Sequence, residues 1–219
     1  MHKLNTIVPD VLYDHGASER NRIGLERLIF FSDAVFAIAI TLLALDIRLP
    51  AGAEMANDGQ LFRMLTGLWP KYFAYILSFW VIGLYWISHH RKFLFIERFD
   101  TRLLRLNLAL LMVIAFIPFP TAVMSANGGR TATIFYALVM ILGGLLVTAL
   151  WWYVVHNHYI GALEHNRKFL WQEVTTPLAT AGIFLLSIGL AFWNDGWARF
   201  CWIMLLPLTL FLNARRAGA

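Results

Sequence analysis

Charged side chains are scarce in this sequence, where Asp, Glu, Lys and Arg make up only 14% of the residues. A soluble domain of this size has about a quarter of its residues charged, so the low share excludes an ordinary water-soluble fold. Hydrophobic residues make up 59% and aromatic residues 15%, and the mean hydropathy is +0.63. The composition therefore predicts a protein that lies in a lipid bilayer.

Cysteine occurs once, at Cys201, which excludes an intrachain disulfide. A secretory signal is also missing, because the first 27 residues are polar and mixed, and such a signal carries a short apolar stretch before its cleavage site. The first apolar stretch is therefore expected to stay in the mature protein. The net charge of +5 comes from basic residues spread between the hydrophobic stretches, which argues against nucleic acid as a partner.

Internal duplication is missing as well, because the residues around Ser32 and Asp33 occur once in the chain. If one helix of each subunit lined a pathway, several subunits would be needed to enclose it.

Six hydrophobic stretches have a length close to the ~20 residues that a helix needs to cross the hydrocarbon core. They are residues 29–47, 68–88, 103–124, 131–155, 174–193 and 197–213, of which the last is short and contains Pro207. The sequence thus predicts an all-α integral membrane protein with six transmembrane helices. These helices form one domain over residues 1–219, with residues 1–27 as an N-terminal segment on the cytoplasmic side.

The orientation follows from the basic residues between these stretches. If the N-terminus is cytoplasmic, 13 of the 18 Lys and Arg residues lie on the cytoplasmic side. The other five are Arg48, Arg63, Lys71, Arg130 and Arg199. Because cytoplasmic loops are enriched in Lys and Arg, this bias predicts that both termini are cytoplasmic, as an even number of spans requires.

The first span begins with a carboxylate, Asp33, in a stretch that otherwise suits lipid. An ionisable group at membrane depth costs at least ~2.5 kcal/mol, so Asp33 is expected to face protein or water and to have a partner. The alternative is that Asp33 has no special role and is tolerated because it lies near the inner membrane interface. Donors at the same expected depth are Arg27, Trp86, His89 and Asn107, which together could form a network around Asp33.

Helical geometry divides this span into two faces. At about 100° per residue, Phe31, Ala34, Leu42 and Leu45 fall within about 40° of Ile38, and Thr41 falls about 60° away. Asp33 lies about 140° and Ser32 about 120° from Ile38. If the apolar stripe faces a central pathway, Asp33 points back into the subunit; if the stripe faces lipid, Asp33 faces a water-filled interior. Such an apolar stripe more commonly contacts lipid or packs against another helix.

The segment Arg27-x-x-x-Phe31-Ser32-Asp33, followed by an apolar helix, resembles the signature of the transmembrane protein 175 family of potassium channels. Two further segments are similar to that family: Trp86-Ile-Ser-His89, and the stretch RLNLALLMVIAFIPFPTA that begins at Arg105. The resemblance covers the chain as one six-helix unit. Animal members carry two such units, so this chain resembles the prokaryotic type, which implies a homotetramer in the plasma membrane.

The resemblance also implies roles for individual residues. In that family the first helix lines the ion pathway, and an apolar side chain a turn and a half after the motif forms its narrowest ring. This position is Ile38, with Leu42 and Leu45 as further rings and Thr41 as a nearby hydroxyl. Arg27, Phe31, Ser32 and Asp33 would then support the pore helix together with Trp86, His89 and Asn107.

Selectivity in such a channel must arise without a ring of carbonyl groups, because the sequence has no Thr-Val-Gly-Tyr-Gly segment. A hydrophobic constriction that passes partly dehydrated potassium ions is expected instead, with no cofactor. Asp46, near the outer end of the first helix, could concentrate cations at the mouth. Its alternative is a solvated carboxylate paired with Arg48.

Three other functions compete with a channel. Asp33 and His89 could exchange protons in a proton-coupled transporter or a proton leak pathway, although transporters usually show repeats and broken helices. An enzyme would need clustered acidic, metal-binding or nucleophilic residues, and the 13 acidic residues are scattered, so an enzyme is not expected. A non-conducting scaffold would be distinguished only by recording current.

Overall fold

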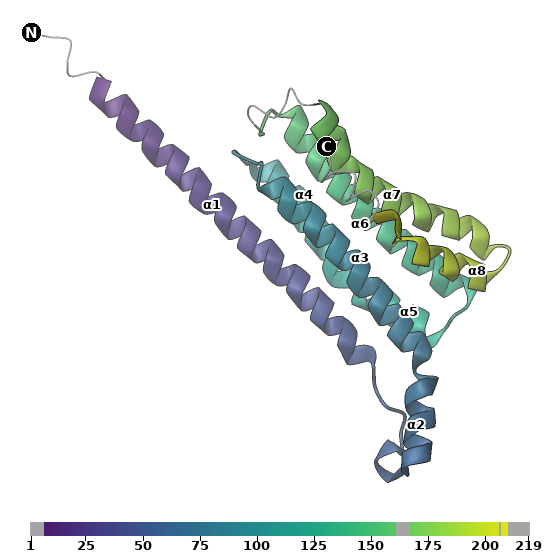
Figure 1. The fold of residues 1–219 in the computed structure, drawn as a ribbon. Coiled ribbons are helices and arrows are strands. Elements are labelled where there is room, and N and C mark those ends of the chain that lie inside the picture. Colours follow the sequence, from purple (N-terminus) through teal and green to yellow (C-terminus); the bar gives the residue numbers. More distant parts are fainter. Residues whose placement is uncertain (1–6, 161–166, 206, 210–219) are drawn as a thin grey trace, which may run out of the picture.

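A computed structural model gives the fold and describes residues 7–160, 167–205 and 207–209. The chain folds into long helices that run side by side (Figure 1). The helices are α1 (Ile7–Leu42), α2 (Asp58–Gly67), α3 (Trp69–Phe93), α4 (Thr101–Phe116), α5 (Pro118–Ala126), α6 (Arg130–His156), α7 (Arg167–Ala191) and α8 (Asp195–Phe200). The 3-10 segments are η1 (Leu43–Asp46), η2 (Ala53–Met55) and η4 (Cys201–Met204).

Five of the six predicted spans correspond to helices that are long and apolar enough to cross a membrane. These are Glu19–Asp46, Trp69–Phe93, Thr101–Ala126, Arg130–His156 and Leu170–Ala191. The sixth prediction, residues 197–213, falls partly on α8 and η4 and partly on residues 206 and 210–213, which lie outside the described part of the chain. The sixth crossing therefore stays a prediction.

The third span consists of two helices, α4 and α5, that meet at Ile117. Pro118 and Pro120 follow directly, and a proline ring lacks the N–H that would continue the hydrogen-bond ladder of α4. A proline is well tolerated in the first turn of a helix, where its N–H would have no partner, so α5 can begin at Pro118. The two prolines explain why the predicted span 103–124 is divided.

Polar side chains fix the loops at both ends of the bundle. Asn57 and Gln60 form a capping box at the start of α2, with both hydrogen bonds at 2.9 Å. Asp100 caps α4 by accepting the N–H of Leu103 at 2.8 Å, and it also accepts the Tyr153 hydroxyl at 2.7 Å. Burial acts to raise the pKa of Asp100, but these two donors together with Arg102 outweigh it and hold the pKa below its usual value. The cap therefore also ties the α3–α4 connection to α6.

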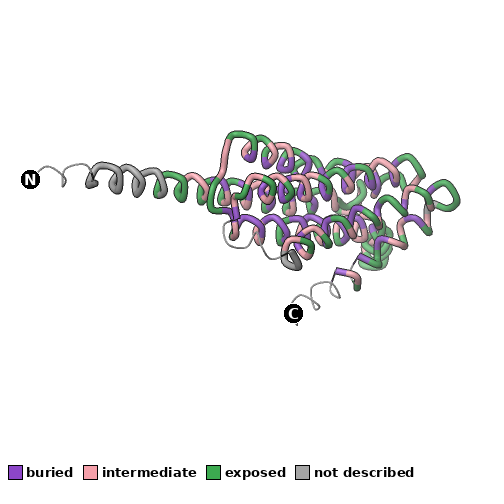
Figure 2. Tube along the Cα trace, turned by 90° about the horizontal axis from the view of Figure 1, so that it is seen from above, coloured by how far each residue is buried: buried purple, intermediate pink, exposed green. Residues whose placement is uncertain are grey.

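The buried core lies between α3, α4, α6 and α7, and α1 lies along one edge of the bundle, beside α3 and α4 (Figures 1 and 2). In the most apolar window of each span, 28% of α1 is buried within the chain, compared with 39–50% in the other four described spans. A membrane helix that buries so little of itself in its own subunit requires lipid or another chain as cover. The N-terminal part of α1 extends past the ends of α3 and α4 (Figure 1).

Close packing of α6 on α7 depends on Gly144, because a Cβ at this position would come within 2.9 Å of the Pro177 carbonyl oxygen. A backbone oxygen cannot rotate away as a flexible side chain can. We expect Gly144→Ala to lower the melting temperature of the purified protein by several degrees, since overpacking typically costs ~1–3 kcal/mol. Circular dichroism in detergent measures this change.

Gly182→Ala is the matched control, because Gly182 also lies in a long apolar helix and no atom of the described residues lies within 4 Å of its added Cβ. Both substitutions gain the same helix propensity, so their difference isolates the contact with Pro177. Equal melting temperatures for the two variants would contradict the close approach of α6 and α7.

Candidate pore helix and its supporting contacts

One face of α1 and of η1, which continues α1 and carries Leu43 and Leu45, is buried against the rest of the chain, and the other face is open. The buried face carries Ser32, Phe36, Ala39 and Leu43, each at most 2% exposed. The open face carries the predicted apolar stripe, whose large members are 42–61% exposed: Phe31, Ile38, Leu42 and Leu45. Thr41 is also exposed, and its hydroxyl donates to the Ile38 carbonyl at 2.8 Å. The stripe thus points away from its own subunit.

The buried face of α1 is held by a directed series of hydrogen bonds from three helices. The Asn107 amide of α4 donates to the Ser32 hydroxyl at 2.9 Å, and Ser32 donates to the Leu28 carbonyl at 2.8 Å. His89 Nε2 of α3 lies 2.8 Å from the Asn107 carbonyl oxygen, which can only accept, so this ring nitrogen carries the proton. Ser32, His89 and Asn107 are at most 1% exposed. Buried polar groups satisfied in this way fix the distance between α1, α3 and α4.

Aromatic rings hold His89 in place from both sides. Its ring stacks on Phe93 with centroids 4.2 Å apart and contacts Phe36 of α1 at 5.5 Å. Among the described residues His89 Nδ1 has no hydrogen-bond partner, as expected for the acceptor nitrogen of a neutral imidazole in an apolar setting. His90, the next residue, stacks on Trp86 instead, with centroids 5.5 Å apart.

Asp33 has a separate partner, the indole of Trp86, whose Nε1 donates to the carboxylate at 2.9 Å. Asp33 is half-buried and Trp86 is 39% exposed, so this contact lies at the border between α1, α3 and the outside of the chain. The carboxylate therefore turns toward its own subunit, on the opposite side of α1 from Ile38.

Arg27 does not join these contacts within the chain. Its side chain is exposed, and no hydrogen bond or ion pair joins it to another residue in the described part of the protein. The sequence placed Arg27 with Asp33 because both stand at the start of the first span. They are six residues apart, so they lie on different faces of α1.

At the other end of α1, the Asp46 carboxylate accepts the Ser125 hydroxyl of α5 at 2.8 Å, and its backbone carbonyl accepts Lys71 Nζ of α3 at 3.0 Å. The described residues show no ion pair between Asp46 and Arg48. Arg48 Nε instead donates to the Leu45 carbonyl at 3.1 Å. Asp46 is half-buried, so it is held by α3 and α5 rather than free in solution.

The sequence did not single out two buried polar clusters. Ser78 of α3 lies 2.8 Å from the Thr121 hydroxyl of α5 and 2.9 Å from the Tyr136 hydroxyl of α6, so three hydroxyls satisfy one another inside the core. Lys92 of α3 and Glu173 of α7 form the second cluster, and they are 0% and 1% exposed. For the second cluster the sequence does contain two signals. One is a lysine in the last turn of an apolar span, and the other is a proline four residues after a glutamate.

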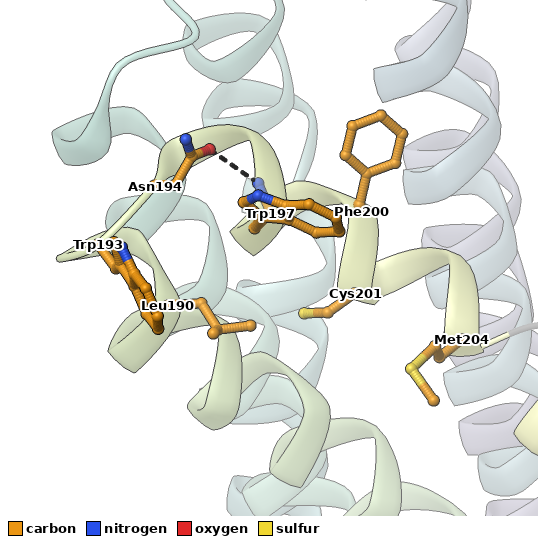
Figure 3. A pocket seen from close by; sticks show the side chains of 7 residues that line it. All are labelled: Leu190, Trp193, Asn194, Trp197, Phe200, Cys201 and Met204. Carbon is orange, nitrogen blue, oxygen red and sulfur yellow. Dashed lines mark hydrogen bonds between the residues drawn. The ribbon is translucent and has the colours of Figure 1, made fainter.

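A cavity of about 500 Å³ lies where α7 turns into α8, far along the chain from these contacts. It is lined by Leu190, Trp193, Asn194, Trp197, Phe200, Cys201 and Met204 (Figure 3). Asn194 points back to α8 and accepts the Trp197 N–H at 3.1 Å. The exposed Trp193 and Trp197 match the aromatic belt of a membrane interface. None of the residues predicted to line or support a pathway belongs to it.

Comparisons with known proteins agree with this picture. The family model described as "Endosomal/lysosomal potassium channel TMEM175" matches residues 27–118, which include the Phe-Ser-Asp motif, Trp86, His89 and Asn107. A protein of Streptomyces collinus named a potassium channel is 42% identical over 76% of this chain and 82% of its own. A protein of Danio rerio named an endosomal/lysosomal proton channel is 30% identical over 64% of this chain and 26% of its own.

Solved structures show the same arrangement of helices. The crystal structure of a lysosomal potassium-selective channel TMEM175 homolog from Chamaesiphon minutus has a TM-score of 0.70 and 30% identity, and covers 87% of this chain and 98% of its own. A second crystal structure, of a variant of the potassium channel MtTMEM175 in complex with a nanobody fusion protein, shares the fold at a TM-score of 0.60 and 18% identity.

The long apolar helices and the similarity to these proteins define a multi-pass membrane protein of the cation channel class, not an enzyme. The chain belongs to the TMEM175 family.

Proposed function

We propose that the chain is a potassium-selective channel whose pathway is lined by α1 from each of four identical subunits in the plasma membrane of a prokaryote. The single observation that carries this proposal is the division of α1 into two faces. Its buried face is hydrogen-bonded to α3 and α4, and its open face presents Ile38, Leu42 and Leu45 to something outside the subunit. Relatives from Streptomyces and Chamaesiphon are named potassium channels, which favours potassium as the permeant ion.

Four Ile38 side chains meeting at the axis would form a hydrophobic constriction. Such a ring resists wetting when narrow and passes a partly dehydrated cation when slightly wider. Potassium sheds its water more easily than sodium, so the ring favours potassium without a carbonyl filter. The described spans support this proposal because they are helical along their length, with no re-entrant loop between α1 and α3 beyond the short η1, η2 and α2.

The proposal includes six spans and cytoplasmic termini. Lys71 is one of the five basic residues assigned outside, and it bonds the Asp46 carbonyl, so these two residues share one end of the bundle. Ser32, Asp33, His89 and Asn107 then lie toward the cytoplasmic side. Their role is to hold the pore helix, and the permeating ion does not touch them.

The test is a record of current from the purified protein in planar bilayers with potassium on one side and sodium on the other. A potassium-selective current that rises linearly with the electrochemical driving force, without saturating, supports a channel. A saturable flux that depends on a proton gradient would indicate a transporter instead. If folded oligomers carried no current, the proposal would be contradicted.

Asp46 at the outer mouth gives a smaller expected effect. Asp46→Asn should lower inward potassium conductance about twofold at low ionic strength, because the carboxylate raises the local cation concentration. The difference should disappear in about 1 M salt, where the screening length falls to about 3 Å. Equal single-channel conductance of the two proteins at low salt would show that Asp46 has only its structural bond to Ser125.

Proton conduction is the second candidate, favoured by the Danio rerio relative named a proton channel. The Asn107 amide interrupts the series from His89 to Ser32, since an amide group does not exchange protons readily. Protons would therefore share the central pathway with potassium. A reversal potential that follows the pH gradient at constant potassium would establish this activity.

A further inference from the structure

Pro177 lies inside α7 and leaves one carbonyl group of that helix without its usual donor. The N–H of residue 177 would bond the carbonyl of Glu173, four residues earlier, and proline has no N–H. A backbone carbonyl without a partner is costly in a membrane, where no water replaces the lost bond. The structure supplies a substitute: Nζ of Lys92, on α3, donates to the Glu173 carbonyl at 2.9 Å.

Lys92 is completely buried, and several groups that contact its Nζ stabilise an ammonium ion. Its Nζ also donates to the hydroxyl of Ser88 and lies 3.6 Å from the Glu173 carboxylate. The face of the Trp151 ring of α6 is 5.8 Å from Nζ, within the range of a cation–π contact. Arg91, one residue earlier, forms an ion pair with the other oxygen of Glu173. We call Arg91, Lys92, Glu173 and Pro177 the clasp.

The clasp lies close to the residues that hold α1. Trp86 and His89 are on the same helix as Lys92, and six residues of helix span only about 9 Å. Helix α3 is therefore bonded to α1 and α4 through Trp86 and His89, and to α7 through the clasp. A shift of α3 relative to α7 would carry Trp86 and His89 with it and so displace α1.

We infer that the clasp positions the pore helix: Lys92 replaces the N–H that Pro177 lacks, and together with Arg91 and Glu173 it fixes α3 on α7. This inference rests on the proposed function only in assigning the pathway to α1. The clasp residues are positioning residues, because none of them belongs to the open face of α1.

The substitution Lys92→Met tests the inference, with Pro177→Ala as its partner. Alanine restores the missing N–H, so the Glu173 carbonyl no longer depends on Lys92. We expect Lys92→Met to lower the melting temperature by several degrees in the wild-type background and by less in the Pro177→Ala background, where only the other contacts of Lys92 are still lost. Equal losses in both backgrounds would contradict the bond between Lys92 and the vacated carbonyl.

Single-channel recording separates positioning from simple stability. Lys92→Met should lower the open probability several-fold and leave the potassium-to-sodium reversal potential unchanged, and Pro177→Ala should restore part of the loss. A merely structural role would reduce the number of active channels and leave the open probability of each one at the wild-type value, which would overturn the inference.

Two further measurements keep the test decisive. If Lys92→Met yields no folded protein, Glu173→Gln is recorded instead, because glutamine keeps the size and one acceptor oxygen of the side chain. An unchanged open probability in Glu173→Gln would overturn the inference. If the wild-type protein carries no current, the proposed function fails, while the melting temperatures of the four proteins still decide whether Lys92 and Pro177 are coupled.

Discussion

Ile38→Asn should abolish most of the discrimination between potassium and sodium. Asparagine is similar in length to isoleucine but polar, so a ring of four would stay wet and admit hydrated ions of either kind. With potassium and sodium on opposite sides, the reversal potential should move toward zero by roughly 59 mV for each tenfold loss of selectivity. Planar bilayer recordings of the purified wild-type and variant proteins measure this shift.

Leu142→Asn provides the control, because Leu142 of α6 is 48% exposed and belongs to a span with no assigned pathway. The same polar change there should alter stability or yield and leave the reversal potential at the wild-type value. An unchanged reversal potential in Ile38→Asn, or an equal shift in Leu142→Asn, would contradict the assignment of the open face of α1 to the pore.

Asp33→Ala should lower the open probability about tenfold with little change in ion preference. The substitution removes the acceptor of the Trp86 indole, and a hydrogen bond to a charged group contributes ~1.5–3 kcal/mol, here reduced by partial exposure. A tenfold change corresponds to about 1.4 kcal/mol. Open probability and reversal potential are measured together in single-channel recordings.

Asp33→Asn separates the hydrogen bond from the charge. The amide oxygen of asparagine can still accept the indole N–H, so this variant should keep most of the wild-type open probability. If instead Asp33→Asn and Asp33→Ala lose selectivity equally while assembly stays normal, the carboxylate acts on the permeating ion, and α1 must be rotated relative to our proposal.

The positions of the five described spans follow directly from the sequence, because length and apolar composition are local properties. The two faces of α1 also follow, since a regular helix fixes the angle between Ile38 and Ser32 at about 120°. The angle alone does not show which of the two faces packs against the rest of the subunit. The structure answers this with the buried Ser32 and the exposed Ile38.

Tertiary partners could not be derived in the same way. Asp33 and Trp86 are 53 residues apart, and Ser32 and Asn107 are 75 apart, so only the packing of whole helices decides that they meet. Arg27 was an equally good donor for Asp33 by position, and it lies on another face of the helix. Lys92 counted as one more cytoplasmic charge until the fold placed it beside the carbonyl that Pro177 leaves open.

The central claim, that the open face of α1 lines the ion pathway, is tested most directly by chemical modification of a single cysteine. Cys201 is the only native cysteine, so Cys201→Ser gives a background without thiols. In this background Ile38→Cys is treated with a charged, water-soluble thiol reagent during recording. Our account predicts rapid block of the potassium current at Ile38→Cys and no block at Leu142→Cys. An unaffected current from Ile38→Cys, with labelling of the thiol confirmed by mass, would contradict it.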